Sequence, residues 1–316
     1  MLDSINFYAG LPIRTYMQMY HQQIPLAFLF SIFLKMFNIA RPEFIRGFNV
    51  MFNILSVISL YLITCHISKK YKNLTHLTGK ACGCGAPEPC CFRNKPNKPL
   101  FLFLILTFVT LPMVATFIYG DWPALALCLL SVYFMMKYVE TKTKKWSIFG
   151  VICSSFAFMF RMNSLIFVIA TVIYLVLDFI HEFTKNERKK NVIKGLIILL
   201  YIIITILPSS MIKTLYLKKY HLDPNIEYPN ISYILMAMEE GPRANGWYKE
   251  ERGEYALQNS DAAKDEYKEE IKERLQYFVK NPGYTFKFYI DKITSMWTEN
   301  TYSAVRVNAI GPYEFL

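Results

Sequence analysis

Long apolar runs separated by short basic loops constrain the fold of this chain more than any other feature. The runs approach the roughly 20 residues that a helix needs to cross a bilayer. The chain is 53% hydrophobic and has a mean hydropathy of +0.23, values that exclude an ordinary soluble globule. We therefore predict an all-α fold: a polytopic transmembrane helical bundle with interfacial helices and an extracytoplasmic C-terminal segment. The predicted spans are residues 48–66, 100–119, 123–138, 146–160, 165–180 and 192–208.

The basic loops predict the orientation of these spans. Lysine and arginine gather at residues 69–72, 142–145 and 185–190, each directly after an apolar run. Cytoplasmic loops carry such an excess of positive charge, and the three loops agree on one orientation. The net charge of +11 is therefore interpreted as a topology signal and not as a nucleic-acid footprint. Residues 121, 161 and everything after about residue 213 are predicted to lie outside.

The two ends of the chain need a separate interpretation. Residues 24–37 form an apolar run that contains Lys35 and is short for a span, so we predict an interfacial or re-entrant helix. A true span with the N-terminus inside is the alternative. Residues 213–316 form the extracytoplasmic segment, with a helix at about 261–280 and an amphipathic helix at about 284–297 that lies on the membrane. Residues 1–212 then constitute the membrane module.

Four cysteines share the basic loop between the first two predicted spans. Their spacing, C-x-C followed by C-C, lacks the paired C-x-x-C of a typical zinc site. A reduced cytoplasmic loop is the preferred interpretation, metal binding is the alternative, and no metal-ligand set is predicted. These residues are Cys82, Cys84, Cys90 and Cys91.

Two charged residues interrupt the apolar runs on the predicted outer side. Asp121 stands between two spans, where a poorly solvated carboxylate is costly. It is either the N-cap of the following helix or a general base that orients an acceptor. Arg161 runs against the positive-inside bias, so an anionic partner is expected, and a guanidinium can bind a lipid-linked phosphate bidentately. Asn163 is predicted to line the same site.

Two further polar clusters lie on the same predicted side. His21 and Gln22 lead directly into an apolar run, so they either begin a helix or form a substrate-contacting rim, with His21 as acid/base or metal ligand. The second cluster combines acids, an arginine, an amide and aromatic rings, as an exposed turn or a carbohydrate site would. Its predicted substrate-binding residues are Glu239, Glu240, Arg243, Asn245, Trp247 and Tyr248.

The order of these motifs resembles that of bacterial GT-C membrane glycosyltransferases. The motifs are Tyr-His-Gln-x-x-Pro at 20–25, Tyr-Gly-Asp-x-Pro at 119–123, Arg-x-Asn-x-Leu-Ile at 161–166 and Gly-Trp-Tyr at 246–248. Within that superfamily the chain is similar to the protein mannosyltransferase and aminoarabinose transferase-like enzymes. The resemblance covers most of residues 16–300.

The resemblance implies transfer of a hexose or pentose from a polyprenyl-phosphate donor to a lipid, polymer or protein acceptor outside a bacterial plasma membrane. It matches Asp121 to the second acidic position of the family and carries the first acidic position to Asp3. No cofactor is specified, and a divalent cation is compatible with such a site. Members of the family usually have a span before the first acid and more spans at the end, so a fragment is also expected.

Two functions of other classes remain open at this point. One is a transporter or flippase for a lipid-linked or anionic solute, although the chain shows neither repeated halves nor a pair of broken spans. The other is an inactive fragment that acts as a membrane scaffold.

Overall fold

A computed structural model describes residues 17–37, 42–78, 101, 105, 120–183, 188–224, 227–241, 244–247, 249, 252, 255 and 260–298. Helices account for most of these residues and no strand occurs among them, which confirms the all-α prediction. The chain divides into two compact units, which are described separately below. One is Pro25–Ile212, and the other combines Met1–Ile24 with Lys213–Leu316.

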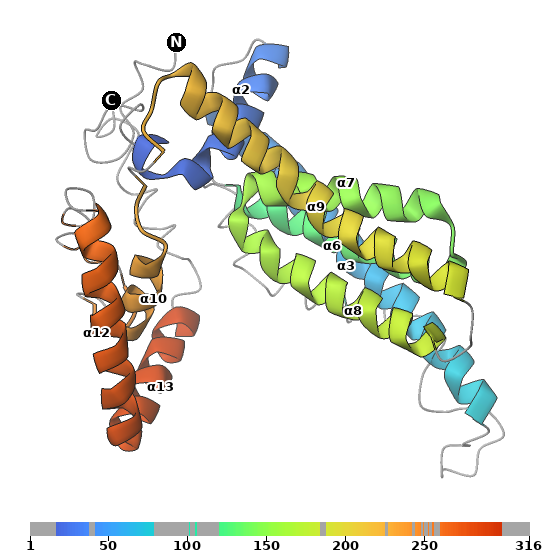
Figure 1. The fold of residues 1–316 in the computed structure, drawn as a ribbon. Coiled ribbons are helices and arrows are strands. Elements are labelled where there is room, and N and C mark those ends of the chain that lie inside the picture. Colours follow the sequence, from blue (N-terminus) through green and yellow to red (C-terminus); the bar gives the residue numbers. More distant parts are fainter. Residues whose placement is uncertain are drawn as a thin grey trace. The chain divides into compact units, whose positions relative to one another are not determined.

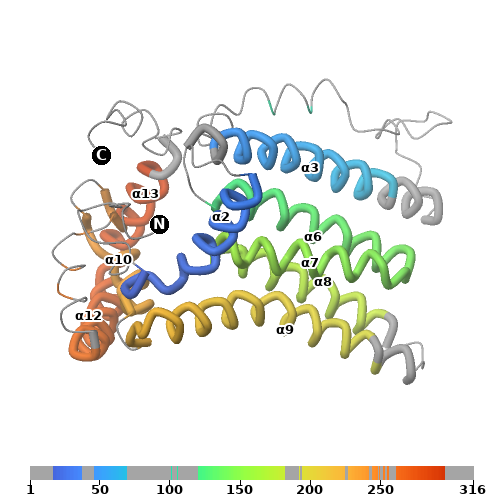
Figure 2. Tube along the Cα trace, turned by 90° about the horizontal axis from the view of Figure 1, so that it is seen from above, coloured from blue at the N-terminus to red at the C-terminus, as the bar shows by residue number. Residues whose placement is uncertain are grey.

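The first unit is a group of long apolar helices arranged around α6 (Figures 1 and 2). Helix α6 contacts α3, α7 and α8, and buried Met135 and Tyr138 of α6 pack with Tyr201 of α9. The helices of this unit are α2 (Ile24–Phe37), α3 (Pro42–Thr78), α6 (Asp121–Thr141), α7 (Lys144–Phe160), α8 (Leu165–Phe183) and α9 (Arg188–Lys219).

Short polar side chains connect these helices in their interior. The Ser131 hydroxyl donates to the Gly150 carbonyl at 2.8 Å and lies 3.3 Å from the Tyr201 hydroxyl. The Thr205 hydroxyl donates to the Ser154 hydroxyl at 3.2 Å. Small polar residues let helices approach closely and satisfy each other's hydrogen bonds where water is absent.

Four helices are long and apolar enough to cross a membrane: Arg46–Lys69, Asp121–Thr141, Met162–His181 and Lys194–Lys219. Many of their apolar side chains point outward, as lipid-facing residues do; Ile166, for example, is 70% exposed. Helix α7 has 17 residues and is not among the four. The predicted span at 100–119 lies outside the described residues, apart from residues 101 and 105.

The second unit is built on three helices, α10 (Ile231–Met238), α12 (Ser260–Lys280) and α13 (Pro282–Thr298), together with the short 3-10 helix η1 (His21–Gln23). Helix α12 contacts both α10 and α13. It spans the residues at about 261–280 where the sequence predicts a helix. Its apolar face supplies Tyr267 to a core with Leu235, and Phe278 to a core with Phe288. The helical spacing of these side chains explains why α12 buries one face while its other face carries charges.

The two units divide between Ile212 and Lys213, the position of the predicted division, but they differ from it in the assignment of the N-terminal residues. Residues 17–24, expected in the membrane module, pack with the C-terminal segment instead. The backbone N–H of Tyr228 donates to the Met19 carbonyl at 2.9 Å, and the rings of Tyr20 and Tyr228 lie 5.8 Å apart. Apolar runs predict spans, but they do not indicate which distant segment will cover a short polar stretch.

Candidate functional site

An ion pair joins the two charged residues that interrupt the apolar runs. Arg161 Nε lies 2.9 Å from Asp121 Oδ1. Asp121 is the first residue of α6 and Arg161 directly follows the last residue of α7. Because α6 and α7 pack as an antiparallel pair joined only by Lys142 and Thr143, the end of α7 returns to the beginning of α6. The tertiary fold therefore brings the two residues together.

The pair is accessible from outside the helices. The Asp121 side chain is 47% exposed and that of Arg161 is 29% exposed. Helix α6 begins at Asp121, so the N-cap position belongs to Gly120 and the N-cap interpretation of Asp121 is wrong. A carboxylate in the first turn still interacts favourably with the positive end of the helix dipole.

Gly120 allows the close approach of the two helix ends. A Cβ atom at Gly120 would overlap the carbonyl oxygen of Phe160 and lie 3.0 Å from Leu26 Cδ1. Only glycine avoids that overlap, since neither the carbonyl nor the helix end can rotate away. The glycine of the Tyr-Gly-Asp-x-Pro motif thus sets the distance between Asp121 and Arg161.

The apolar floor beneath the pair is aromatic. Phe160 of α7 contacts Phe48 and Phe52 of α3 and Phe30 of α2, with ring centroids 6.2–6.3 Å apart. Trp122 is buried beside Asp121, and its Nε1 has no hydrogen-bond partner among the described residues. Such packing holds the helix ends rigidly, as a site on a defined scaffold requires.

Asn163 lies two residues beyond Arg161, in the 3-10 helix η2 (Met162–Ser164). Its side chain is exposed. The neighbouring Ser164 hydroxyl donates to the Ala157 carbonyl at 3.0 Å and fixes this turn on the end of α7. Asn163 therefore belongs to the same end of the first unit as the ion pair.

His21 is fully buried in the second unit, where its ring faces a carboxylate. Its Nδ1 lies 3.5 Å from Glu227 Oε2, and Lys213 Nζ lies 3.2 Å from the same oxygen. The contact with His21 is the main cause that lowers the pKa of Glu227, and Lys213 adds to it. The neighbouring Gln22 donates from Nε2 to the Tyr233 hydroxyl at 3.2 Å. His21 and Gln22 therefore connect the N-terminal residues of the second unit to its C-terminal segment.

The predicted carbohydrate loop is a tight turn closed by its own backbone. The N–H of Gly246 donates to the Glu239 carbonyl at 2.7 Å, and Glu240 and Asn245 form an isolated antiparallel bridge. Gly246 has φ +84°, the left-handed conformation that glycine adopts readily. Asn245 donates to the Phe288 carbonyl at 3.0 Å, and Trp247 is half-buried. Asn245 therefore connects the described part of the loop to α13.

Three of the predicted site residues lie outside the described residues. They are Asp3, Arg243 and Tyr248, and the cysteine loop at 82–91 falls outside as well. Among the residues that the structure does describe, no group of three or more His, Cys, Asp or Glu side chains is placed to hold a metal ion.

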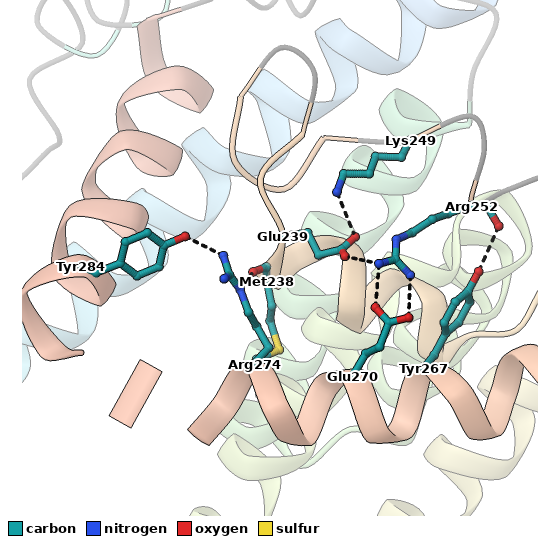
Figure 3. A network of polar contacts seen from close by, with 8 residues as sticks. All are labelled: Met238, Glu239, Lys249, Arg252, Tyr267, Glu270, Arg274 and Tyr284. Atoms are coloured by element: carbon teal, nitrogen blue, oxygen red, sulfur yellow. Dashed lines mark hydrogen bonds and ion pairs between the residues drawn. The ribbon is translucent and has the colours of Figure 1, made fainter. Parts of the chain in front are cut away.

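A charged network includes Glu239, the first residue of the loop (Figure 3). Arg252 Nη2 lies 2.5 Å from Glu239 Oε1 and 2.6 Å from Glu270 Oε2, while its Nη1 donates to Glu270 Oε1 at 3.0 Å. Lys249 approaches Glu239 at 3.7 Å, and the Tyr267 hydroxyl donates to the Arg252 carbonyl. The hydrogen bonds to Glu270 are the main cause that raises the pKa of Arg252. The network anchors the loop to α12.

A second arginine of α12 lies among aromatic rings. The Arg274 guanidinium is 4.9 Å from the Phe278 ring centroid and within 5.5 Å of three further rings. It donates to the Met238 carbonyl at 2.8 Å and to the Tyr284 hydroxyl at 2.6 Å (Figure 3). The Tyr284 hydroxyl in turn donates to Glu240 Oε1 at 2.6 Å. Arg274 thus joins α10, α12 and α13 to the loop.

An open groove of about 510 Å³ runs between the loop, α10 and α12. Tyr277, which is 43% exposed, contributes an aromatic side chain to its lining. The carboxylates of the groove supply hydrogen-bond acceptors, and its lysine and arginine side chains supply donors. The lining residues are Leu235, Glu239, Glu240, Lys249, Glu270, Glu273, Arg274 and Tyr277.

The sequence analysis missed several residues of this region. Arg274 could have been identified from the sequence. It follows Tyr267 by seven residues and therefore lies on the apolar face of α12. A charge on a buried face usually has a specific partner. Glu227 and Arg252 had no such signal, since each stands in a polar context where a charged side chain is ordinary.

Residues 90–208 match the model of the dolichyl-phosphate-mannose-protein mannosyltransferase family. No curated protein and no solved structure matched the chain. The matched segment contains both Asp121 and Arg161, and it confirms the resemblance to membrane glycosyltransferases of the GT-C type that the motifs indicated.

Proposed function

We propose that this chain, whose residues 90–208 match a family of membrane mannosyltransferases, transfers a sugar from a polyprenyl-phosphate donor to an extracytoplasmic acceptor. The acceptor is a lipid, a polymer or a protein. The site faces the outer side of a bacterial plasma membrane that the chain crosses several times, as the basic loops predict.

The observation that carries the proposal is the ion pair between Asp121 and Arg161. A charged side chain in an apolar segment costs free energy. Here both charged residues stand at helix ends, where they remain accessible. The chemistry of transfer needs the same two groups. A carboxylate can accept a proton from the acceptor, and a cation can stabilise the charge that develops on the leaving phosphate.

The reaction is a single displacement. The acceptor hydroxyl oxygen attacks the anomeric carbon, the bond from that carbon to the phosphate oxygen breaks, and its electron pair stays on the phosphate. Asp121 orients the hydroxyl and takes its proton. Arg161 holds the phosphate. Its guanidinium faces Asp121 through Nε, and the edge formed by its two Nη atoms is the one that binds the phosphate. One displacement inverts the configuration at the anomeric carbon.

The groove of the second unit is the proposed acceptor site. Saccharide rings stack on exposed aromatic faces such as Tyr277, and carboxylates such as Glu240 and Glu273 accept hydrogen bonds from hydroxyl groups. Arg243, Trp247 and Tyr248 of the loop remain predicted contacts, and Asp3 remains a predicted acid of the transfer site. Asn163 is proposed to contact the donor beside Arg161.

His21 has a positioning role in this proposal. A fully buried ring that faces Glu227 holds residues 17–24 against the C-terminal segment. It therefore acts on the substrate only through the arrangement of that segment.

The test uses membranes that contain the full chain and radiolabelled polyprenyl-phosphate sugars. Transfer is expected for the natural sequence and is expected to be lost in Asp121→Asn and Arg161→Ala at unchanged expression. Asp178→Asn is a matched control, since Asp178 is also paired, with Lys194 at 2.8 Å and Lys142 at 3.1 Å, outside the proposed site. This control should retain transfer.

Two results would contradict the proposal. Full transfer by Asp121→Asn would remove the assigned role of that carboxylate. Movement of the labelled lipid across the membrane with no covalent transfer from any donor would instead favour the transporter.

A further inference from the structure

Two consecutive hydrogen bonds join three elements of the second unit and end at the groove. Arg274 Nη2 of α12 donates to the Tyr284 hydroxyl of α13 (Figure 3), and this hydroxyl donates to Glu240 Oε1, each at 2.6 Å. A guanidinium has no acceptor, so the tyrosine oxygen accepts from Arg274 and its single proton goes to Glu240. Glu240 lies two residues beyond the end of α10 and lines the groove. The direction of both bonds is therefore fixed, and it leads from a buried cation to a groove carboxylate.

The Tyr284 hydroxyl is held in place by the packing of its ring. The centroid of this ring lies 5.1 Å from that of Tyr277, 6.1 Å from that of Phe288 and 6.2 Å from that of Phe278. Burial is the main cause that raises the pKa of Tyr284, and the hydrogen bond to Glu240 adds to it. The hydroxyl therefore keeps its proton at neutral pH and remains a donor in a defined position.

Glu240 is held by its backbone as well as by its side chain. Its backbone forms the isolated antiparallel bridge with Asn245, whose side chain donates to the Phe288 carbonyl at 3.0 Å. Oε1 accepts the hydrogen bond from Tyr284, while Oε2 accepts none from any residue that the structure describes. Both oxygens of a carboxylate are hydrogen-bond acceptors. Glu240 thus combines a fixed orientation with one oxygen that is left for a ligand.

The other three carboxylates that line the groove differ from Glu240. Glu239 and Glu270 both accept hydrogen bonds from Arg252, so they are already neutralised by a cation. Glu273 is exposed and makes no hydrogen bond or ion pair with another described residue, so nothing there fixes its orientation. Among the described residues of the groove, Glu240 is therefore the carboxylate that is best prepared to bind a ligand.

We propose that Glu240 is a specificity-determining residue of the groove, where it accepts a hydrogen bond from a hydroxyl group of a saccharide, and that Tyr284 is its positioning residue. The inference rests on the proposed function where it identifies this saccharide as the acceptor of the transferred sugar. A mobile carboxylate loses side-chain freedom when it binds, whereas the hydrogen bond from Tyr284 has already restricted Glu240. Tyr284 acts on the saccharide only through Glu240, as a supporting residue behind a binding group does.

The experiment screens the full chain in detergent micelles on an array of neutral oligosaccharides and measures the Kd for the one that is retained most strongly. The variants are Glu240→Gln, Tyr284→Phe and the two combined. Tyr284→Phe keeps the ring and its packing, so it should fold. Tyr289→Phe is the matched control on α13, at a residue that is 40% exposed and outside the groove lining. Glu269→Gln is the matched control for the carboxylate, at a side chain on α12 that is 70% exposed.

Glu240→Gln is expected to raise the Kd about tenfold and Tyr284→Phe about fivefold, since each removes a hydrogen bond to a charged group. The combined variant should bind within about twofold of Glu240→Gln alone, because Tyr284 acts through Glu240 and the two effects are not additive. A merely structural role of Tyr284 would raise the Kd by the same factor in both backgrounds. Both control variants should bind like the natural sequence.

Three results would each overturn the proposal: no oligosaccharide is retained, Tyr284→Phe binds like the natural sequence, or its effect is the same with and without Glu240. Sugar transfer from a labelled polyprenyl-phosphate donor is measured separately. The expected pattern of Kd values without any transfer would contradict the proposed function and support this inference. Transfer together with an unchanged Kd in Tyr284→Phe would support the proposed function and overturn the inference.

Discussion

Replacing Gly120 by alanine should separate Asp121 from Arg161 without removing either charge. The added Cβ would overlap the Phe160 carbonyl oxygen and meet Leu26 Cδ1 at 3.0 Å. The backbone carbonyl cannot move aside as a flexible side chain could, so the beginning of α6 has to shift away from the end of α7. Overpacking of this kind costs about 1–3 kcal/mol of folding free energy.

The shift should affect transfer more than stability. A displacement of about 1 Å in a positioned catalytic group can cost on the order of 100-fold in rate. Unfolding in mixed detergent micelles measures the loss of stability. Transfer from a labelled polyprenyl-phosphate sugar measures the loss of transfer rate. Both should fall in Gly120→Ala.

Gly47→Ala provides the matched control, because Gly47 is exposed within α3 and nothing lies within 4 Å of its added Cβ. Alanine in an open helix interior should stabilise by about 0.5–1 kcal/mol. The two alanines should therefore change stability in opposite directions. If Gly120→Ala were as stable and as active as the natural sequence, the close approach of the helix ends would have no role in the site.

Four further outcomes are expected. Asp121→Asn should lower stability by no more than about 1 kcal/mol, since exposed ion pairs contribute little, and a loss several times larger in micelle unfolding would make the pair structural. Arg252→Ala should cost about 1–3 kcal/mol because it leaves two carboxylates facing each other, and Arg252→Lys, which cannot bind both at once, should recover only part of this stability. Because the pKa of Glu227 is lowered in the folded state, its ionised carboxylate stabilises the fold at pH values above the ordinary pKa of 4.5. Unfolding measured from pH 7 to pH 3 should therefore show that stability is lost as the pH falls through the folded-state pKa. Glu227→Gln should flatten this pH dependence. An impermeant thiol reagent should label Cys82 or Cys90 only after cells are lysed, and labelling of intact cells would invert the predicted topology.

Chain order and charge pattern predicted the membrane helices because burial in lipid demands long apolar segments. They also indicated Asp121 and Arg161, since a charge in such a segment is costly and is retained for a reason. The same reasoning could not reveal that the two residues pair. Their contact depends on the antiparallel packing of α6 against α7 and on the space that Gly120 leaves.

The periodicity of residues 261–280 predicted which face of α12 is apolar, but not what covers it. Arg274 shows the difference. Its position on the apolar face can be read from the spacing, whereas its four aromatic neighbours come from both α12 and α13.

By itself, the sequence therefore determined that the chain is helical, that it enters a membrane and which charged residues are out of place there. These properties depend on local composition and on a repeat of 3.6 residues, which neighbouring residues specify. Only the tertiary structure decided the partners, such as Glu227 for His21 and Glu270 for Arg252. Partners are brought together by packing between segments far apart in the chain, and no local pattern encodes that choice.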